Sequence, residues 1–260
     1  MTKTPDLLSL QGNVCLITGA ASGLGAAMAE HFADQGARLI LVDRNAIGLD
    51  KLATQLSTSG AKLHTLVGDM ADAKAVAQMA QMALRHWGRI DTVICNAGME
   101  GPVGAMHEAP KASRDHLFQV NLFSNLDLLQ KLLPDMSRQG AGSVILMSSI
   151  AGLRGNRHIG LYGVTKAALA QVARNLAVEW GPKGIRVNAI APGLIRTPFA
   201  EHLMQNRDFI ERRIAHTPLR RVGKPEEIAA VARLLASPGG AFITGQTLVV
   251  DGGTLISDGN

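Results

Sequence analysis

One tyrosine and a lysine four residues later form the pair with the clearest chemical potential. Tyr162, the only tyrosine of the chain, and Lys166 lie in a stretch with helical periodicity. Their side chains therefore project from one face about a turn apart. A phenol has an ordinary pKa of about 10, and a nearby ammonium group stabilises the phenolate and lowers that pKa. The pair predicts a tyrosine that acts as a general acid or base.

Two adjacent serines precede this pair. Ser148 and Ser149 close a short apolar segment, and Ser149 lies 13 residues before Tyr162. If that segment is a strand that ends at the same sheet edge, a hydroxyl group there can hydrogen-bond a substrate oxygen as charge develops on it. The alternative is a serine that caps the following turn.

A glycine-rich turn near the N-terminus is typical of phosphate binding. Residues 18–25 read Thr-Gly-Ala-Ala-Ser-Gly-Leu-Gly, between an expected strand and an expected helix. Glycines allow a tight turn and a close approach of the backbone to a pyrophosphate, which then meets free N–H groups at the positive end of the helix dipole. This context favours a dinucleotide site over an ordinary turn.

Asp43 ends the next expected strand, 18 residues after Gly25. A carboxylate at about this spacing binds a ribose 2′-hydroxyl and repels a 2′-phosphate, which favours NAD over NADP. Arg44 is the next residue, and its positive charge can weaken the repulsion of the 2′-phosphate of NADP. The alternative is that Asp43 caps the following helix.

These residues require a scaffold that brings distant segments to one edge. Seven short segments rich in β-branched residues alternate with six longer stretches of helical periodicity. We expect strands at 14–18, 38–42, 62–67, 92–95, 143–147, 186–190 and 247–250, and helices near 23–36, 45–59, 72–87, 112–138, 160–180 and 225–236. The alternation predicts a single-domain α/β fold, a Rossmann-type doubly wound sheet of about seven parallel strands with helices on both faces.

The insertion segment, residues 197–218, interrupts this alternation. It follows the sixth expected strand and contains Pro198, Pro218 and an amphipathic middle. Because open parallel sheets bind ligands at the carboxyl ends of their strands, we expect this segment to form a substrate lid. An ordinary surface helix is an equal alternative. Residues 1–260 otherwise form one domain, with residues 1–10 expected to be a flexible N-terminus.

Composition excludes several classes of protein. The 260 residues are 47% apolar and 18% charged, with a net charge of +5, which is unlike a disordered chain. Cys15 and Cys95 cannot build a disulfide framework and no zinc spacing is present, so a reducing compartment and no metal are expected. The absence of a signal or bilayer-spanning stretch predicts a cytoplasmic protein with no membrane partner. Scattered basic residues without interleaved aromatic residues predict no nucleic-acid partner.

Together these motifs resemble the classical subfamily of short-chain dehydrogenases/reductases. The resemblance extends from about Gln11 to Gly253 and rests on Thr-Gly-x-x-x-Gly-x-Gly at residues 18–25 and Tyr-x-x-x-Lys at Tyr162. It implies an oxidoreductase that transfers a hydride between NAD(H) and a secondary alcohol or ketone. The catalytic residues implied by the resemblance are Ser149, Tyr162, Lys166 and Asn121.

The resemblance also implies the cofactor contacts. Asp69 would contact the adenine ring, and the segment from Pro192 to Thr197 would hold the nicotinamide and the diphosphate. The full expected set is Gly19, Ser22, Gly23, Leu24, Gly25, Asp43, Arg44, Asp69, Met70, Asn96, Ala97, Gly98, Tyr162, Lys166, Pro192, Gly193, Ile195 and Thr197. The family usually shows Asn-Asn-Ala-Gly where this chain has Cys95, Asn96, Ala97 and Gly98, a change that we expect to spare catalysis.

Substrate contacts are expected in the loop after Ser149 and in the insertion segment. The expected set is Met99, Ala151, Leu153, Arg154, His158, Phe199, Leu203 and Met204. These residues predict a mostly apolar pocket for a small alcohol or ketone. Arg154, Arg157 and His158 can also meet an acidic substrate, although solvated loop cations are the simpler interpretation.

Two other classes of function compete with this hypothesis. A non-catalytic dinucleotide-binding sensor or scaffold can have the same fold, but it does not account for Ser149, Tyr162, Lys166 and Asn121 together. A nucleic-acid binder would show salt-sensitive binding of DNA or RNA. The last expected strand and the helices near 112–138 and 160–180 resemble the subunit contacts of the family, which implies a homotetramer.

Overall fold

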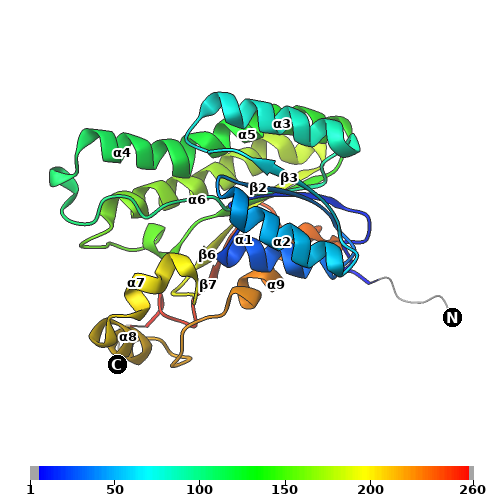
Figure 1. The fold of residues 1–260 in the computed structure, drawn as a ribbon. Coiled ribbons are helices and arrows are strands. Elements are labelled where there is room, and N and C mark those ends of the chain that lie inside the picture. Colours follow the sequence, from blue (N-terminus) through cyan, green and yellow to red (C-terminus); the bar gives the residue numbers. More distant parts are fainter. Residues whose placement is uncertain (1–5, 258–260) are drawn as a thin grey trace.

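Seven parallel strands form one sheet at the centre of the computed structural model, which describes residues 6–257 (Figure 1). The order across the sheet is β3-β2-β1-β4-β5-β6-β7, and every neighbouring pair is parallel. The strands are β1 (Val14–Thr18), β2 (Arg38–Asp43), β3 (Lys62–Val67), β4 (Thr92–Cys95), β5 (Gly142–Met147), β6 (Ile185–Pro192) and β7 (Thr247–Val250). The sequence prediction of the fold class is confirmed.

Helices cover both faces of this sheet. One layer contains α1 (Gly23–Ala33), α2 (Ala46–Thr58) and α9 (Pro225–Ala236), and the other contains α3 (Ala73–Trp87), α4 (Lys111–Phe118), α5 (Ser124–Arg138) and α6 (Gly160–Trp180). Two more helices, α7 (Glu201–Met204) and α8 (Arg207–Ala215), belong to the insertion segment and stand apart from both layers (Figure 1). The chain therefore reverses winding direction between β1 and β4, which opens a crevice at the carboxyl ends of these strands.

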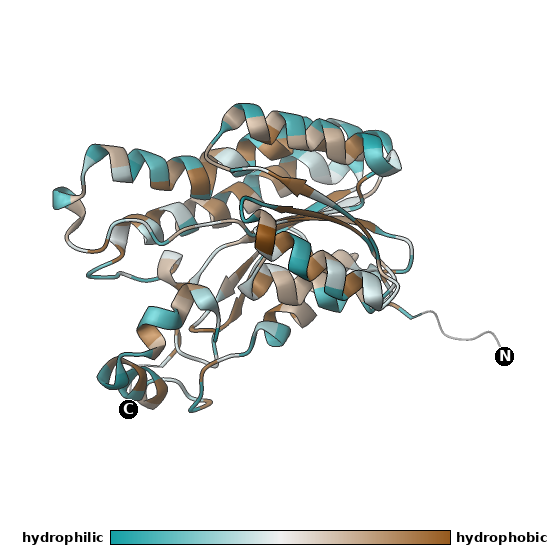
Figure 2. Ribbon diagram, viewed as in Figure 1, coloured by the Kyte–Doolittle hydropathy of each residue, from teal (hydrophilic) through white to brown (hydrophobic). Residues whose placement is uncertain are grey.

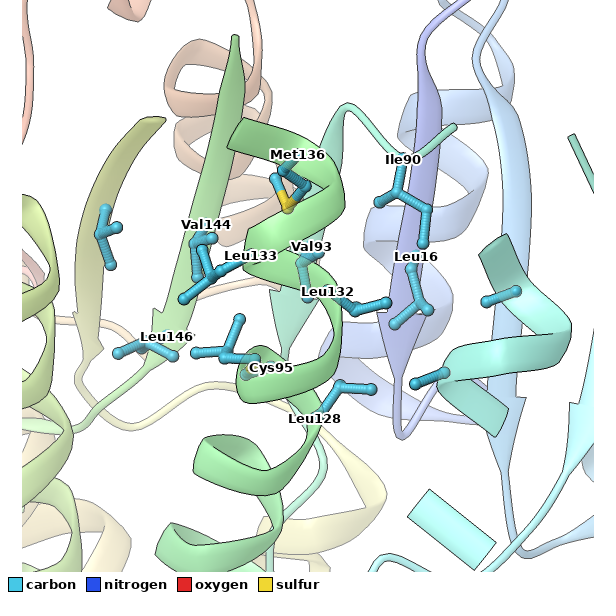
Figure 3. Close-up of a cluster of buried hydrophobic side chains, with 14 of the residues drawn as sticks. Leu16, Ile90, Val93, Cys95, Leu128, Leu132, Leu133, Met136, Val144 and Leu146 are labelled. Carbon is cyan, nitrogen blue, oxygen red and sulfur yellow. The ribbon is translucent and has the colours of Figure 1, made fainter. Parts of the chain in front are cut away.

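The core consists of two apolar clusters, one on each face of the sheet. Leu16 and Val93 face the layer of α3, α5 and α6, whereas Ile17 and Ile94 face the layer of α1, α2 and α9. Figure 2 shows hydrophobic strands at the centre of the molecule, as expected for a parallel sheet that is buried on both faces. Figure 3 shows how Leu128, Leu132 and other side chains of α5 cover the sheet on one face.

A π-helical turn interrupts the helix that the sequence predicts at 112–138. Gln119–Phe123 form this turn between α4 and α5, and the backbone N–H of Ser124 donates to the carbonyl of Gln119. The Ser124 hydroxyl donates to the Val120 carbonyl, and the Asn125 amide donates to the Asn121 carbonyl. Polar side chains thus supply donors to carbonyl groups within the turn. Hydrophobic periodicity cannot reveal one such extra residue, and turns of this type are frequent at functional sites.

Part of the N-terminal segment expected to be flexible is packed against α9. Leu10 is buried in the core, and the carbonyl of Leu8 accepts a hydrogen bond from Arg233 Nε at 2.8 Å. These contacts hold residues 8–10 in place, because a buried leucine and a fixed backbone carbonyl both restrict the chain. Residues 1–5 of that prediction lie outside the described residues.

The two cysteines are free and buried on the neighbouring strands β1 and β4. Burial raises the pKa of Cys15 and of Cys95 to about 12, so both remain thiols at neutral pH. Within residues 6–257, no group of three or more His, Cys, Asp or Glu side chains is arranged to hold a metal ion. No helix in the same range is long and apolar enough to cross a membrane.

Candidate active site

A cavity of about 380 Å³ lies at the carboxyl ends of the strands. It extends from the glycine-rich turn after β1 to the insertion segment after β6. One continuous cleft therefore joins the expected cofactor-binding turn to the expected substrate lid. Every expected cofactor residue except Gly25 lines this cleft, together with Ser149 of the expected catalytic group. The fold therefore brings together segments that the sequence distributes over almost 180 residues.

The glycine-rich turn is tight and leads directly into α1. Gly19 and Gly23 have positive φ angles of 64° and 56°, and a Cβ atom added to Gly25 would lie 2.0 Å from the carbonyl oxygen of Gly19. The amide of Asn96 donates to the carbonyls of Thr18 and Gly19 at 2.9 and 3.0 Å, which fixes the turn against β4. A side chain at Gly25 would collide with the turn itself and one at Gly19 with the backbone of Ala97, so glycine is what lets the turn close this tightly before the N-terminus of α1.

The carboxylate of Asp43 lies where a ribose-binding group is expected. Its two oxygens accept hydrogen bonds from the backbone N–H groups of Ala21 and Asn45, each at 2.9 Å, and its side chain lines the cleft. Asn45 caps α2, so the alternative interpretation of Asp43 as a helix cap does not hold. Arg44 lies 3.9 Å from Asp69 across the same end of the cleft.

The two serines after β5 have different roles. The buried hydroxyl of Ser148 donates to the carbonyl of Lys166 at 2.7 Å, which ties β5 to α6. Ser149 lies at the cleft, and its Oγ accepts the backbone N–H of Ala151 at 3.1 Å. The Ser149 hydroxyl lies close enough to the phenol of Tyr162 to lower its pKa. Ser149 is therefore the serine that can contact a reacting oxygen together with Tyr162.

Burial dominates the electrostatics of Tyr162 and Lys166. It raises the pKa of Tyr162 to about 12, against the lowering effect of the nearby Ser149 hydroxyl, and the charge of Glu100 raises this pKa further. Burial also lowers the pKa of Lys166 to about 8. The Lys166 Nζ donates to the Met147 carbonyl at 2.8 Å and lies 5.4 Å from the centre of the tyrosine ring. The protein groups alone therefore do not produce the low phenol pKa that the sequence analysis expects from Lys166.

Asn121 is buried behind the cleft, in the π-helical turn. Its side-chain oxygen accepts the backbone N–H of Met99 at 2.8 Å, and its amide nitrogen donates to the carbonyl of Met99 at 2.8 Å and to the Thr165 hydroxyl at 3.2 Å. The side chain thus binds the strand-end segment after β4 to α6. It does not line the cleft, so any catalytic part that it plays acts through neighbouring groups.

The insertion segment borders the cleft, as the lid hypothesis expects. Phe199 and Leu203 line it, and the ring centre of Phe199 lies 6.3 Å from that of Tyr162. Of the other expected substrate contacts, Met99, Ala151 and Arg154 line the cleft. Three do not. They are Leu153 and His158, whose side chains are exposed on the surface loop, and Met204.

Two charged residues of the cleft were missed by the sequence analysis. Glu100 follows Met99 and lies 3.4 Å from Nε2 of His202 on α7. Arg213 lies on α8, where its position in an amphipathic helix was the only signal in the sequence. Glu100 lies near Tyr162, because its charge raises the pKa of the phenol, and Arg213 lines the same cleft.

The chain is similar to known oxidoreductases. A family model described as enoyl-(acyl carrier protein) reductase matches residues 19–254. An uncharacterized oxidoreductase from Mycobacterium tuberculosis is 40% identical over 249 residues, which cover 95% of this chain and 94% of the relative. Other relatives carry the name dehydrogenase/reductase SDR family member 4.

Solved structures agree with these matches. A 7α-hydroxysteroid dehydrogenase complexed with NADH and 7-oxo glycochenodeoxycholic acid is 32% identical, with a TM-score of 0.91 over 97% of this chain and 98% of that chain. A relative of that name occurs in Escherichia coli. The second structure is described as a putative NAD(P)-dependent gluconate 5-dehydrogenase from Beutenbergia cavernae with bound NADP. It is 30% identical, with a TM-score of 0.92 over 96% of this chain and 100% of that chain.

Proposed function

Because this chain belongs to the short-chain dehydrogenase/reductase family, we propose that Tyr162 is its general acid and base and that NAD is its preferred cofactor. The protein is an NAD(P)-dependent oxidoreductase that transfers a hydride between the cofactor and an alcohol or ketone. A non-catalytic sensor finds no support among relatives that are named dehydrogenases or reductases. The observation that carries the proposed roles is that Ser149, Tyr162 and Lys166 meet in one cleft, where the Ser149 hydroxyl is near enough to lower the pKa of the phenol.

The proposed mechanism uses three side chains at one end of the cleft. In oxidation, the Tyr162 oxygen takes the hydroxyl proton of the alcohol, while the Ser149 hydroxyl donates to the same oxygen. In reduction, Tyr162 returns this proton to the ketone oxygen. Lys166 supports the phenol from the buried side, where the Met147 carbonyl fixes its ammonium group. The nicotinamide ring, when bound, supplies the hydride chemistry, and the protein supplies orientation and proton transfer.

The residues of the other half of the cleft fit a dinucleotide. Gly19 and Gly23 would accommodate the diphosphate, and Asp69 and Met70, which line the cleft, would border the adenine ring. Asp43 supports the preference for NAD, because its carboxylate would bind the ribose hydroxyls and repel a 2′-phosphate. Asp69 faces the Arg44 guanidinium, which weakens the attraction of Arg44 for a phosphate.

Kinetics with NAD and NADP side by side test this cofactor preference. For a panel of secondary alcohols, the wild type is expected to have a higher kcat/KM with NAD. Asp43→Ala should reduce the NAD-to-NADP ratio by about tenfold or more, because removal of one close repulsive charge is worth at least ~1.4 kcal/mol. Adding Arg44→Ala should lower activity with NADP again. A wild type that prefers NADP would contradict the assignment of Asp43.

We also propose that the protein is a cytoplasmic homotetramer. Its free, buried thiols suit a reducing compartment. Apolar side chains are exposed on the elements that resemble the subunit contacts of the family, including Phe123 in the π-helical turn, Val178 on α6 and Val249 on β7. Sedimentation is expected to give four times the 27.4 kDa mass of one chain. A sedimenting mass of one chain would contradict the tetramer.

A further inference from the structure

Two arginines line the cleft and form no ion pair with the described acidic side chains. Arg154 lies in the loop after β5, and Arg213 lies on α8 of the insertion segment, so distant parts of the chain bring them to one cavity. Among residues 6–257, neither guanidinium forms an ion pair with a carboxylate. Both therefore retain donors for a ligand in the cavity that also contains Ser149 and Tyr162.

Arg213 is placed in an unfavourable position for a cation. Its Nε atom is buried and has no hydrogen-bond partner in the described part of the chain. Burial lowers the pKa of Arg213, and the positive charge of Arg154 lowers it further, against a smaller opposite effect of Asp251. The ring of Phe209 lies 5.8 Å from the guanidinium carbon and shields it on one side. A buried donor without an acceptor costs stability, and an anion in the cleft would satisfy it.

The other charges of the cleft leave this end positive. Asp43, Asp69 and Arg44 lie at the ends of β2 and β3 or just beyond, across the sheet from the insertion segment. Glu100 is the acidic residue near Tyr162, and His202 lies 3.4 Å from its carboxylate. Away from the ends of β2 and β3, two guanidinium groups thus line the cleft against one carboxylate, that of Glu100, which already has a neighbour of its own. Asp251 acts on Arg213 from outside the cleft lining, and its oxygens accept the backbone N–H groups of Gly253 and Leu255.

We propose that the substrate of this enzyme is an alcohol or ketone that carries a carboxylate, and that Arg154 and Arg213 bind this carboxylate. The inference rests on the proposed function, because it places the reacting carbon at Tyr162. Guanidinium groups present planar pairs of donors that match a carboxylate. Arg157 and His158, which the sequence analysis grouped with Arg154, do not line the cleft and remain loop cations.

Paired substrates test the inference. The probes are 4-oxopentanoate, 5-oxohexanoate and 4-oxocyclohexanecarboxylate, each compared with its methyl ester in the presence of NADH. The wild type should have a kcat/KM at least tenfold higher for the acids. Arg213→Gln and Arg154→Gln should each reduce this ratio toward one, mainly through KM. The matched controls Arg212→Gln and Arg157→Gln replace neighbouring exposed arginines outside the cleft and should keep the wild-type ratio.

A binding measurement separates this inference from the proposed catalytic roles. Calorimetry with the enzyme–NADH complex should detect cyclohexanecarboxylate but not cyclohexanecarboxamide, and Arg213→Gln should lose at least tenfold in affinity for the acid. Equal kcat/KM for acids and esters, or a wild type that does not bind cyclohexanecarboxylate, overturns the carboxylate site. Neither result affects the role of Tyr162, which a Tyr162→Phe variant with wild-type turnover would overturn instead.

Discussion

Tyr162→Phe is expected to lower kcat by about 10² to 10⁴, the range attributed to general acid–base catalysis. The substitution removes only the phenolic oxygen and leaves a ring that can keep its place beside Phe199 and over Lys166. Cofactor affinity should therefore remain close to that of the wild type. Steady-state kinetics give the loss of turnover, and quenching of protein fluorescence by NADH gives the affinity.

The two serines supply a matched control for this prediction. Ser149→Ala should also lose turnover, because the Ser149 hydroxyl lies beside the phenol and lowers its pKa, and it can donate to the reacting oxygen. Ser148→Ala removes a structural hydrogen bond to the Lys166 carbonyl and should mainly reduce stability. If Tyr162→Phe kept wild-type turnover with NAD and all accepted alcohols, the proposed mechanism would be wrong.

The single tyrosine makes a direct titration possible. Any phenolate absorbance that appears with rising pH comes from Tyr162, since the chain contains no other tyrosine. Burial raises the pKa of this group to about 12. The proposed base therefore has to be assisted by charge that the described protein groups do not supply, which fits a reaction that proceeds in a ternary complex with the positively charged oxidised cofactor.

The sequence was sufficient to predict the fold and the site residues that lie at the carboxyl ends of the strands. Alternating short β-branched segments and helical periods specify a doubly wound sheet, and right-handed crossovers bring the ends of its parallel strands to one edge. Residues at those ends, such as Gly19, Asp43 and Ser149, were therefore predictable from their place in the pattern. Their contacts depend on backbone geometry that the strand order already determines.

The rest of the site depends on tertiary contacts that no local pattern encodes. Arg213 lies in a helix with a basic surface, and only the docking of the insertion segment turns this one arginine toward the cleft. Glu100 follows a strand by five residues, and its importance comes from its approach to Tyr162. The π-helical turn at Asn121 adds one residue to a single turn of the helix. The hydrophobic periodicity over 112–138 does not reveal this extra residue.

Lys166→Met is expected to abolish most turnover and to change the pH dependence of stability. The variant keeps the volume of the side chain but removes the ammonium group that supports Tyr162. At pH 7 it loses the hydrogen bond to the Met147 carbonyl, worth about 1–3 kcal/mol when one partner remains buried. It also removes the cost of burying a charge. Because these effects oppose each other, the free energy of unfolding at this pH should change little.

The sign of the pH dependence follows from the lowered pKa of Lys166. Burial brings it from 10.5 to about 8, so below pH 8 the folded protein bears the full cost of a buried ammonium group. Between about pH 8 and 10.5 the folded state releases this proton before the unfolded state does, and stability should rise by about 3 kcal/mol. Tyr162 acts in the opposite direction between about pH 10 and 12, because its folded pKa is raised.

Urea unfolding at several pH values between 7 and 10 tests the contribution of Lys166. The wild type should become more stable over this range relative to Lys166→Met, which lacks the titrating group. Lys51→Met replaces a lysine that is exposed on α2 and should retain the wild-type slope. If wild type and Lys166→Met had the same slope, Lys166 would not titrate near pH 8. Its ammonium group would then be stabilised in the folded protein by charge or solvent that offsets its burial.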